Sequence, residues 1–529
     1  MKKILYGFSL VLFVTVFLSC NSAGNKKKSD ENTITDYYGE KYRPQFHFSP
    51  QTGWMNDPNG LVFLDGEYHL FYQFYPDSTV WGPMHWGHAV SSDLVHWTHL
   101  PVALYPDSLG YIFSGSAVVD SKNTAGFADT ENPAIVAIFT YHNPELAGNG
   151  SDSYQSQGIA YSTDKGRTWT KYSGNPVLPN PGKRDFRDPK VFWHDGSGKW
   201  IMILAVSDRV HIYSSPDLKS WSFESEFGDK AGAHGGVWEC PDLFPLEHDG
   251  SGTIRWVMLV SINPGGPNGG SATQYFTGDF DGHHFIPDFS GTKWLDMGTD
   301  NYAGVTWSGI PENDGRRLFI GWMSNWYYAN VVPTTVWRSA MTVPRELSLI
   351  SRNGDFHLIS GPAGELGLLR RKSETLIAEG PDDVLQKEIP MKGNRLNGSE
   401  LIIDLQVSAG TLDDSLGIIL SNDAGEELSI RYSAGTNLFY ADRSRSGESA
   451  FSKRFSGYLS ATYETEETIR IHMFIDASSA EIFVDKGKLV MTALFFPTEE
   501  YTRLRFFSKY PGNYPERIDY YELASIWQQ

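Results

Sequence analysis

The segment SSDLVHW at 91–97 marks the repeat by which this 529-residue chain is organised. Related segments stand at 162–169, 214–221 and, more loosely, 278–285, and each carries an Asp and closes on a Trp or Phe. Each follows a short strand-like run, and its polar side chains favour a tight turn before the next strand. The closing aromatic residues lie 72, 52 and 64 residues apart. This spacing is typical of four-stranded propeller blades with long loops.

Further strand-like runs lie upstream of each turn and complete the blades. They are the runs 61–64 and 68–75, 113–119 and 134–141, 190–193 and 199–206, and 243–246 and 255–262. A fifth unit spans 303–323 and has its own turn at Asn313-Asp314-Gly315. Five such units predict a five-bladed β-propeller over 41–358. The competing architecture, a β-sandwich enzyme, would not repeat its strands in fours.

The character of the chain changes near residue 360. Ser360-Gly361-Pro362 interrupts the repeat, so 359–375 is interpreted as a linker, in which 363–372 is compatible with a short connecting helix. The region 376–529 contains short alternating segments without the turn repeat, at 401–407, 416–420, 428–432, 468–475, 480–484 and 504–507. Many short strands without helices predict a C-terminal β-sandwich. The expected fold class is therefore all-β.

The first twenty residues have the features of a bacterial lipoprotein signal peptide. A basic start precedes an apolar run over 4–18, and Leu18-Ser19-Cys20 ends the run like a lipobox. An ordinary secretory signal would not need a cysteine there, so we expect Cys20 to carry lipid. The polar stretch 21–40 would then be a flexible tether. The only other cysteine, Cys240, would have no partner for an intrachain disulfide bond.

Composition narrows the class of function. The chain has 44 Lys and Arg residues against 63 Asp and Glu residues, a formal charge of −19. Nucleic acids and anionic membrane surfaces need basic patches, so we expect no nucleic-acid partner and membrane contact only through the lipid. A neutral polysaccharide is unaffected by this charge. The 15 His residues show no metal-ligand spacing, and the sequence predicts neither a metal site nor a cofactor.

Three carboxylates occupy similar places in the repeat. Asp57, Asp188 and Glu239 each precede a strand-like run and an Asp-Gly turn, and the turn follows after 8, 7 and 10 residues. Because corresponding positions in a closed propeller point to one axis, these acids should meet in one pocket. Burying unpaired carboxylates is costly, and a fold tolerates this cost mainly where the groups are used. Converging carboxylates flanked by Trp residues favour cleavage of a glycosidic bond.

Neighbouring residues suggest a different role for each acid. Glu239 lies between two apolar residues, a setting that would keep its carboxyl protonated and suit a proton donor. Asp57 follows Asn56, whose amide can hydrogen-bond an ionised carboxylate, which suits a nucleophile. Asp188 follows Arg187, and the two meet only if the backbone turns there. In that case Asp188 would stay charged and could hold sugar hydroxyls.

Four ordered motifs resemble those of glycoside hydrolase family 32, which contains invertases, inulinases and levanases. The motifs are Trp54-Met55-Asn56-Asp57-Pro58-Asn59-Gly60, Phe113-Ser114-Gly115-Ser116, Arg187-Asp188-Pro189 and Glu239-Cys240-Pro241. The likeness extends through 71–73, 81–88 and 476–487, and it covers about 41–529. In appearance the chain is most similar to bacterial levanases.

The resemblance implies retaining hydrolysis of β-fructofuranosides by double displacement, through a fructosyl-enzyme intermediate. It identifies Asp57 as nucleophile, Glu239 as acid/base and Asp188 as stabiliser of the transition state. The residues expected to bind the terminal fructose are Trp54, Asn56, Gln73, Trp81, Phe113, Ser114, Arg187 and Trp322. Each of the three Trp residues has the alternative role of a plain core residue.

The sequence leaves the substrate open among levan, inulin, fructo-oligosaccharides and sucrose. We expect β-fructan to be preferred to sucrose, and levan to inulin, with outer subsites formed by the loops 143–157 and 261–272, whose alternative role is a mobile surface. A fructosyltransferase on the same propeller is one alternative, although such enzymes usually lack the sandwich. A non-catalytic glycan-binding lipoprotein is another, and it would not need three acids. The expected location is the bacterial cell envelope, at the outer membrane, facing the periplasm or the outside.

Overall fold

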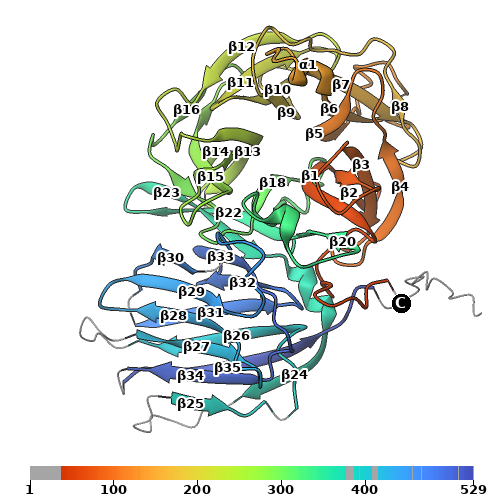
Figure 1. Ribbon diagram of the computed structural model, residues 1–529. Helices are drawn as coiled ribbons and strands as arrows, with labels where there is room; N and C mark the ends of the chain where they lie inside the picture. Colours follow the sequence, from red (N-terminus) through yellow and green to blue (C-terminus); the bar gives the residue numbers. More distant parts are fainter. Residues whose placement is uncertain are drawn as a thin grey trace, which may run out of the picture. The chain divides into compact units, whose positions relative to one another are not determined.

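The computed structural model consists of a five-bladed β-propeller followed by a β-sandwich, so the expected fold class is confirmed (Figure 1). It describes residues 37–129, 131–248, 250–376, 386–391, 393–407, 415–455, 457–465, 467–509 and 512–527. Within these ranges no helix is long and apolar enough to span a membrane. The predicted signal peptide, the lipidation site at Cys20 and most of the predicted tether lie outside the described residues.

Each blade is an antiparallel sheet whose first strand lies nearest the axis, and Figure 1 shows β1, β5, β9, β13 and β18 around that axis. Blade 1 comprises β1 (Gly53–Leu64), β2 (Glu67–Tyr75), β3 (His85–Ser91) and β4 (Thr98–Leu104). Blade 2 comprises β5 (Tyr111–Val119), β6 (Ile135–His142), β7 (Gln155–Ser162) and β8 (Thr170–Lys171), with α1 (Pro144–Gly148) between β6 and β7. Blade 3 comprises β9 (Phe186–His194), β10 (Lys199–Val206), β11 (Arg209–Ser215) and β12 (Ser222–Phe227).

Blades 4 and 5 have extra short strands, and one strand of blade 4, β13, also pairs with one strand of blade 5, β22. Blade 4 comprises β13 (Val237–His248), β14 (Thr253–Asn263), β15 (Ala272–Phe280) and β16 (Phe285–Pro287), with β17 (Lys293–Trp294) beside β15. Blade 5 comprises β18 (Tyr302–Thr306), β19 (Arg317–Met323), β22 (Arg345–Arg352) and β23 (Asp355–Pro362), with β21 (Ala340–Met341) beside β19 and the 3₁₀ helix η1 (Ala329–Val331) in a loop. The strand β20 (Trp337–Arg338) pairs in parallel with the start of β1 and closes the ring against blade 1.

The turn repeat of the sequence joins the third and fourth strands of blades 1 to 4. In blade 1, the carboxylate of Asp93 accepts two backbone N–H groups, and Leu94 has a left-handed φ of 67°. The indole N–H of Trp97 then donates to the Leu94 carbonyl at 2.9 Å. The same type of indole hydrogen bond closes the turns at Trp169 and Trp221. The repeated sequence therefore encodes a repeated hydrogen-bonded turn.

Every innermost strand carries one extra residue at the same place in its pairing with the second strand. In blade 1, Met55 pairs with Phe74 and Pro58 pairs with Tyr72, so two residues of β1 lie opposite one residue of β2. The corresponding bulges lie at 112–115, 187–190, 239–242 and 302–305. A bulge increases the local twist and redirects side chains, and such bulges are frequent beside active sites. These five bulges surround the propeller axis and determine which side chains reach it.

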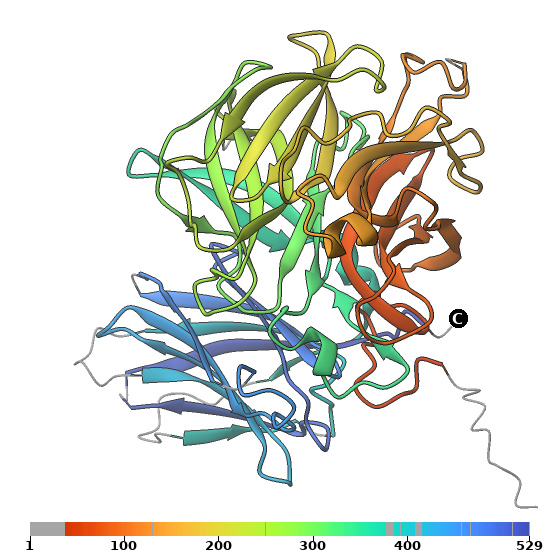
Figure 2. The ribbon, with the colours of Figure 1, turned by 45° about the horizontal axis from the view of Figure 1, so that its top comes forward.

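The 3₁₀ helix η2 (Gly364–Leu369) follows β23 and precedes the sandwich, and it is shorter than the expected connecting helix because β24 begins at Arg370. One sandwich sheet has the order β24 (Arg370–Leu376), β35 (Tyr514–Leu523), β26 (Ser399–Gln406), β31 (Thr468–Ile475), β32 (Ser479–Val484) and β33 (Leu489–Leu494). The other has the order β25 (Gln386–Ile389), β34 (Arg503–Ser508), β27 (Ser415–Ser421), β28 (Glu427–Ser433), β29 (Leu438–Arg445) and β30 (Tyr458–Thr462). Figure 2 shows the two sheets in teal and blue. Apolar side chains from both sheets form one core.

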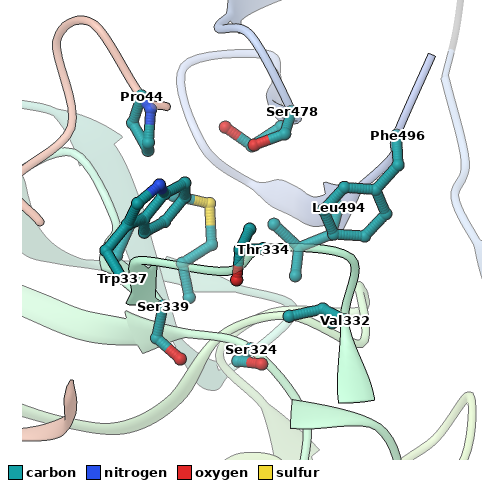
Figure 3. Close-up of a pocket in the computed structure, with 12 residues that line it drawn as sticks. Pro44, Ser324, Val332, Thr334, Trp337, Ser339, Ser478, Leu494 and Phe496 are labelled. Carbon is teal, nitrogen blue, oxygen red and sulfur yellow. The ribbon is translucent and has the colours of Figure 1, made fainter. Parts of the chain in front are cut away.

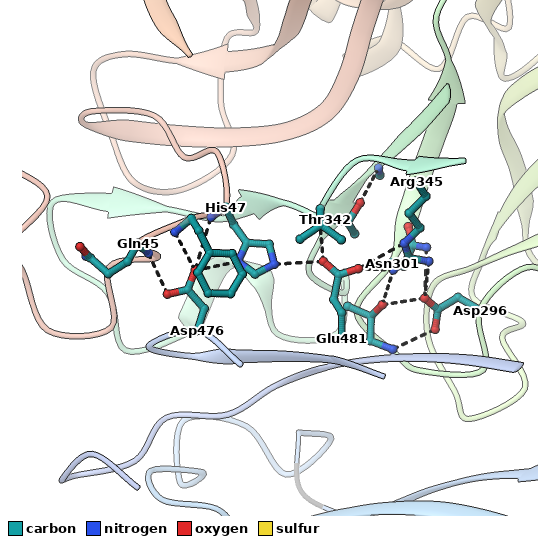
Figure 4. A network of polar contacts seen from close by, with 12 residues as sticks. Gln45, His47, Asp296, Asn301, Thr342, Arg345, Asp476 and Glu481 are labelled. Atoms are coloured by element: carbon teal, nitrogen blue, oxygen red, sulfur yellow. Dashed lines mark hydrogen bonds and ion pairs between the residues drawn. The ribbon is translucent and has the colours of Figure 1, made fainter. Parts of the chain in front are cut away.

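A buried polar network joins the propeller to the sandwich (Figure 4). Arg345 on β22 forms ion pairs with Glu481 on β32 and with Asp296, the latter at 3.0 Å. His47 lies between Asp476 at 2.7 Å and Glu481 at 3.0 Å. Burial alone lowers the pKa of His47, but hydrogen bonds to these two carboxylates raise it to about 9. The imidazole is therefore charged at neutral pH, and the network contains two cations and three carboxylates.

A cavity of about 20 Å³ also lies at the junction of the two domains (Figure 3). Val332 and Trp337 line it from the propeller, Ser478 and Leu494 from the sandwich, and Pro44 from the N-terminal segment. This volume is about the space that one water molecule needs. The side chains around the cavity are therefore closely packed.

Candidate active site

A cleft of about 410 Å³ opens at the propeller axis and receives residues from all five blades. The lining residues are Asn56, Asp57, Gln73 and Trp81; Phe113, Ser114, His142, Tyr154 and Gln155; Asp185, Arg187 and Asp188; Glu239 and Asn263; and Trp326 and Asn330. The three carboxylates thus meet in one cleft. Their positions relative to the bulges differ, however. Glu239 is the last paired residue before the bulge of its strand. Asp188 is the first unpaired residue of its bulge, and Asp57 is the second unpaired residue of its own bulge. This stagger gives each acid different neighbours.

Asp57 is held by donors from blades 1, 2 and 4. The hydroxyl of Ser114 donates to Oδ2 at 2.6 Å, and the amide of Asn56 donates to Oδ1 at 3.0 Å. The thiol of Cys240 lies 3.5 Å from Oδ2. Burial and the nearby Glu239 raise the pKa of Asp57, whereas the hydrogen bonds from Ser114 and Asn56 lower it. These donors therefore favour the ionised carboxylate against the effect of desolvation.

Asp188 has a left-handed backbone, with φ 64°. The backbone N–H of Cys240 donates to its Oδ2 at 3.0 Å, and its own N–H donates to Thr140 Oγ1 at 3.0 Å. The Nε atom of Arg187 lies 3.9 Å from the same carboxylate oxygen. Burial raises the pKa of Asp188 to about 7, although Arg187 opposes this rise. The backbone turns as the Arg187 contact requires, but desolvation outweighs the guanidinium charge, contrary to the expectation of a permanently charged carboxylate.

The carboxylate of Glu239 has polar partners rather than the apolar setting that its sequence neighbours suggest. Nη2 of Arg187 donates to Oε1 at 2.8 Å, and the hydroxyl of Tyr302 donates to Oε2. The neighbouring Trp238 is fully buried, and its indole donates to the Ala233 carbonyl at 2.9 Å. Adjacent residues on a strand point to opposite faces, so the bulky neighbour does not surround the carboxyl. Glu239 is thus fixed by one cation and one hydroxyl.

Arg187 also connects this carboxylate to the wall formed by blade 2. Its Nη1 donates to Asp185 Oδ1 at 2.7 Å. The hydroxyl of Tyr154 donates to the same oxygen at 2.9 Å. A continuous chain of hydrogen bonds therefore runs from Tyr154 through Asp185 and Arg187 to Glu239.

Six of the eight residues predicted to bind sugar line the cleft, namely Asn56, Gln73, Trp81, Phe113, Ser114 and Arg187. Trp54 and Trp322 are fully buried and are not among the lining residues. Trp54 still supports the site, because its indole N–H donates to Asn56 Oδ1 at 2.7 Å. Trp326, four residues beyond Trp322, lines the cleft. Local sequence does not distinguish these two Trp residues, since their exposure depends on how the loop after β19 lies against blade 1.

Sequence reasoning missed a second set of residues at the site. They are His142, Asp185, Tyr302, Trp326 and Asn330. Three further lining residues, Tyr154, Gln155 and Asn263, belong to the loops 143–157 and 261–272 that were expected to form outer subsites. Asp185 stands two residues before Arg187, so its nearness to the acids was open to inference. Most of the others lie outside the repeat motifs, where no local signal marks them. Among the described residues, no group of three or more His, Cys, Asp or Glu side chains is arranged to hold a metal ion.

Comparison with known families accounts for both domains. The model of the glycosyl hydrolases family 32 N-terminal domain matches residues 47–362, and that of the family 32 C-terminal domain matches 365–522. The chain belongs to glycosyl hydrolase family 32.

Individual relatives of this family 32 enzyme are similar over nearly its whole length. It is 46% identical over 502 residues to the levanase of Bacillus subtilis (strain 168), and the match covers 93% of this chain and 72% of that protein. It is 38% identical over 528 residues to the extracellular exo-inulinase of Aspergillus ficuum, covering 93% and 96% of the two chains. The crystal structure of exo-inulinase from Aspergillus awamori gives a TM-score of 0.81 at 36% identity, covering 93% of this chain and all of that one. The β-fructofuranosidase of Schwanniomyces occidentalis complexed with fructosyl-erythritol gives a TM-score of 0.83 at 32% identity, covering 93% and 99%.

The cleft of this family 32 glycosyl hydrolase presents carboxyl groups in two distinct settings. Asp57 accepts hydrogen bonds from a hydroxyl and an amide, whereas Glu239 is held by a guanidinium and a phenol. Two carboxyl groups with different partners are what acid-assisted attack on a glycosidic bond requires.

Proposed function

We propose that this enzyme is a β-fructofuranosidase that hydrolyses the fructosyl linkages of β-fructans with retention of configuration. The observation that carries the proposal is the meeting of Asp57, Asp188 and Glu239 in one cleft, each with different hydrogen-bond partners. The names of its relatives, levanase, exo-inulinase and β-fructofuranosidase, support the same substrate class.

The proposed first step forms a fructosyl ester on Asp57. A carboxylate oxygen of Asp57 attacks the anomeric carbon, and the bond from that carbon to the leaving oxygen breaks. Glu239 donates its proton to the leaving oxygen, so the leaving group departs as a neutral alcohol. In the second step, ionised Glu239 takes a proton from water, whose oxygen attacks the same carbon and releases Asp57. Two inversions at one carbon give net retention.

The remaining polar residues orient these two groups and the sugar. In this proposal Asp188 accepts hydrogen bonds from fructosyl hydroxyls, and it does so best at a pH above its pKa of about 7. Ser114 and Asn56 stabilise the negative charge of Asp57 before attack. Arg187 and Tyr302 fix the Glu239 carboxylate.

Retention is tested by proton and carbon NMR of the first fructose released from a β-fructofuranoside, before mutarotation. We expect the β-anomer to appear first. In a crystal structure, the nucleophile and acid/base carboxyl groups should lie about 5–5.5 Å apart. A first product of opposite configuration, or a separation near 8 Å with room for water, would contradict the double displacement.

Within this class we propose levan as a better substrate than inulin, and both as better substrates than sucrose. The similarity to the Bacillus subtilis levanase supports this order. The measurement is kcat/KM on levan, inulin and sucrose under the same conditions. A clear preference for sucrose would identify an invertase and refute the polymer proposal.

We further propose that the chain is a lipoprotein of the bacterial cell envelope, anchored through Cys20 at the outer membrane. The lipobox-like end of the apolar run supports this proposal. Cys20→Ala should release the protein from the membrane fraction or block its maturation. If the variant still fractionates with membranes, the anchor is not the lipid.

A further inference from the structure

One wall of the cleft, formed by blade 2, is a row of aromatic rings. The ring of His142, at the end of β6, lies 4.3 Å from that of Phe113 with only 7° between their planes. Tyr111 lies on the other strand of the same pair, opposite His142, and its ring is 6.1 Å away at 23°. Tyr154 approaches His142 edge-on at 5.4 Å. We call Phe113, His142, Tyr111 and Tyr154 the blade-2 wall.

The blade-2 wall has the properties of a sugar-binding surface. Phe113, His142 and Tyr154 line the cleft, whereas Tyr111 is not among the lining residues and stacks on His142. Burial and the charge of Arg187 lower the pKa of His142 to about 4, so its ring is uncharged at neutral pH. Flat, uncharged and partly exposed rings offer large contact area to the C–H faces of a sugar. Nothing in the two proposed chemical steps uses these rings.

A buried polar group beside the wall lacks a partner. Gln155 is only 2% exposed and lines the cleft. Its Nε2 lies 3.4 Å from His142 Nδ1, while its Oε1 has no hydrogen-bond partner among the described residues. Either orientation of the amide leaves one end without a strong protein partner. An unpaired buried amide oxygen is costly, and a hydroxyl of a bound sugar would satisfy it.

A chain of hydrogen bonds also connects the wall to the group that protonates the leaving oxygen. Tyr154 is joined through Asp185 and Arg187 to Glu239 by hydrogen bonds of 2.9, 2.7 and 2.8 Å. Because Glu239 gives its proton to the leaving group, sugar units attached to that oxygen must lie near this side of the cleft. The hydrogen-bond chain therefore relates the wall to the leaving group rather than to the attacked fructosyl unit.

Other sides of the cleft are constrained by contacts of their own. Asn268, in the loop from blade 4, is bound to the carbonyl of Met297 at 2.6 Å and to the backbone of Ser460 in the sandwich. Asn330 of blade 5 accepts the backbone N–H of Trp81 of blade 1 at 2.9 Å, which joins the loops of these two blades. The loop 261–272 is thus hydrogen-bonded to the sandwich. The loop 143–157, which carries Tyr154 and Gln155, is part of blade 2.

We propose that the blade-2 wall and Gln155 bind the fructosyl units on the leaving-group side of the bond being cleaved. This inference rests on the proposed hydrolysis of β-fructans and names the part of the protein that recognises the chain. His142 contacts the first leaving unit or units, and Tyr111, which is not among the lining residues, contacts a later one. The enzyme therefore cleaves longer fructosides more efficiently, up to the length that reaches Tyr111.

The test is kcat/KM on a series of β-fructofuranosides that differ only in the leaving group. The series runs from methyl β-fructofuranoside, which has no leaving sugar, to β-2,6-linked oligosaccharides of two to five fructosyl units. His142→Ala should lower kcat/KM about tenfold on chains of two or more units and less than twofold on the methyl fructoside. Tyr111→Ala should show its loss only on the longest chains. Equal losses across the whole series, or no loss on any chain, would overturn the proposal.

Matched variants separate sugar binding from a structural role. His142→Phe keeps a flat ring and should keep the preference for long chains, while Gln155→Leu removes the unpaired amide and should weaken that preference without loss of thermal stability. Phe223→Ala removes an exposed aromatic residue on the outer strand β12, away from the cleft, and should leave the length profile unchanged. If Gln155→Leu changes stability but not the profile, Gln155 is structural and the proposal fails for it.

Titration calorimetry in the Asp57→Asn background measures the affinity of the blade-2 wall for oligosaccharides without turnover. We expect affinity for the β-2,6-linked tetrasaccharide to fall about tenfold when His142→Ala is added. Unchanged affinity would contradict the proposal that the blade-2 wall binds the leaving fructosyl units. A wild-type enzyme that hydrolyses no fructoside at all would instead refute the proposed function.

Discussion

The innermost strands of the propeller and the sheets of the sandwich use antiparallel pairing for different purposes. In the propeller, all five inner strands are broken by a bulge at the axis, and polar side chains such as Asp57, Ser114 and Asp188 project there. In the sandwich, the pairings β26–β31, β31–β32 and β27–β34 run in unbroken register around an apolar core. Regular pairing gives packing, whereas interrupted pairing brings functional groups together.

This difference has an energetic counterpart. Burial raises the pKa of both Asp57 and Asp188, so the axis holds carboxylates at some cost to the folded state. The sandwich core buries side chains such as Ile418 and Ile471 that need no partners. We therefore expect substitutions at the axis to change turnover more than stability, and substitutions in the sandwich to do the reverse.

The largest effect should follow from Asp57→Asn. Loss of the nucleophile should lower kcat by about 10⁴-fold or more on every fructoside, while removing one buried charge leaves the melting temperature unchanged or higher. The matched sandwich variant, Ile418→Ala, should cost about 2–5 kcal/mol of unfolding free energy and leave kcat per folded molecule unaltered. Steady-state kinetics and urea unfolding measure both. A sandwich variant that loses turnover while fully folded would contradict the expectation that the sandwich contributes to stability and not to turnover.

Glu239→Gln should have the next largest effect, and its size should depend on the leaving group. On natural fructans kcat should fall by about 10²–10⁴-fold, because the departing oxygen is no longer protonated. Fructosides with a strongly acidic leaving group need little protonation and should retain their rate in the fructosylation step, measured as a pre-steady-state burst. Equal losses on both kinds of substrate would argue against Glu239 as the acid.

The junction of the two domains should respond through stability alone. Glu481→Gln removes the carboxylate that pairs with Arg345 and His47, and it leaves two buried cations with fewer partners. We expect a loss of about 3–5 kcal/mol in unfolding free energy. The exposed pair Arg167–Glu67 is the control, and Arg167→Ala should cost no more than about 1 kcal/mol. A loss at the junction no larger than this control would show that the network is not a major contributor.

His47 should make the stability of the junction depend on pH. Its pKa is about 9 in the folded protein, against an ordinary value of 6.5, so its contribution is complete below pH 6.5 and is lost as pH rises through 9. The full difference corresponds to about 3 kcal/mol. Urea unfolding between pH 6 and 9 should therefore show a decline in the wild type that is smaller in His47→Gln. Parallel curves for the two proteins would contradict a charged His47.

The smallest expected effect is a shift in a pH profile. Ser114→Ala removes a hydrogen bond that lowers the pKa of Asp57, so that pKa should rise. Because Asp57 must be ionised to attack, the acidic limb of the kcat/KM profile should move to higher pH. Ser114→Thr keeps a hydroxyl and should restore the limb. No movement in Ser114→Ala, with turnover retained, would mean that another group controls that limb.

The amino-acid sequence by itself determined the number of blades, the sandwich and the three acids. Turns such as that at Asp93 and Trp97 are made by residues a few positions apart, so their chemistry is visible in the sequence. The motifs around the acids are equally local.

Only the tertiary structure decided how those acids are surrounded. The one-residue stagger of Asp57, Asp188 and Glu239 depends on how each inner strand pairs with the next strand. The polar partners of Glu239, and the exposure of Trp326 where Trp322 was expected, arise from contacts between blades. Such contacts join residues that are far apart in the sequence, and no local pattern records them.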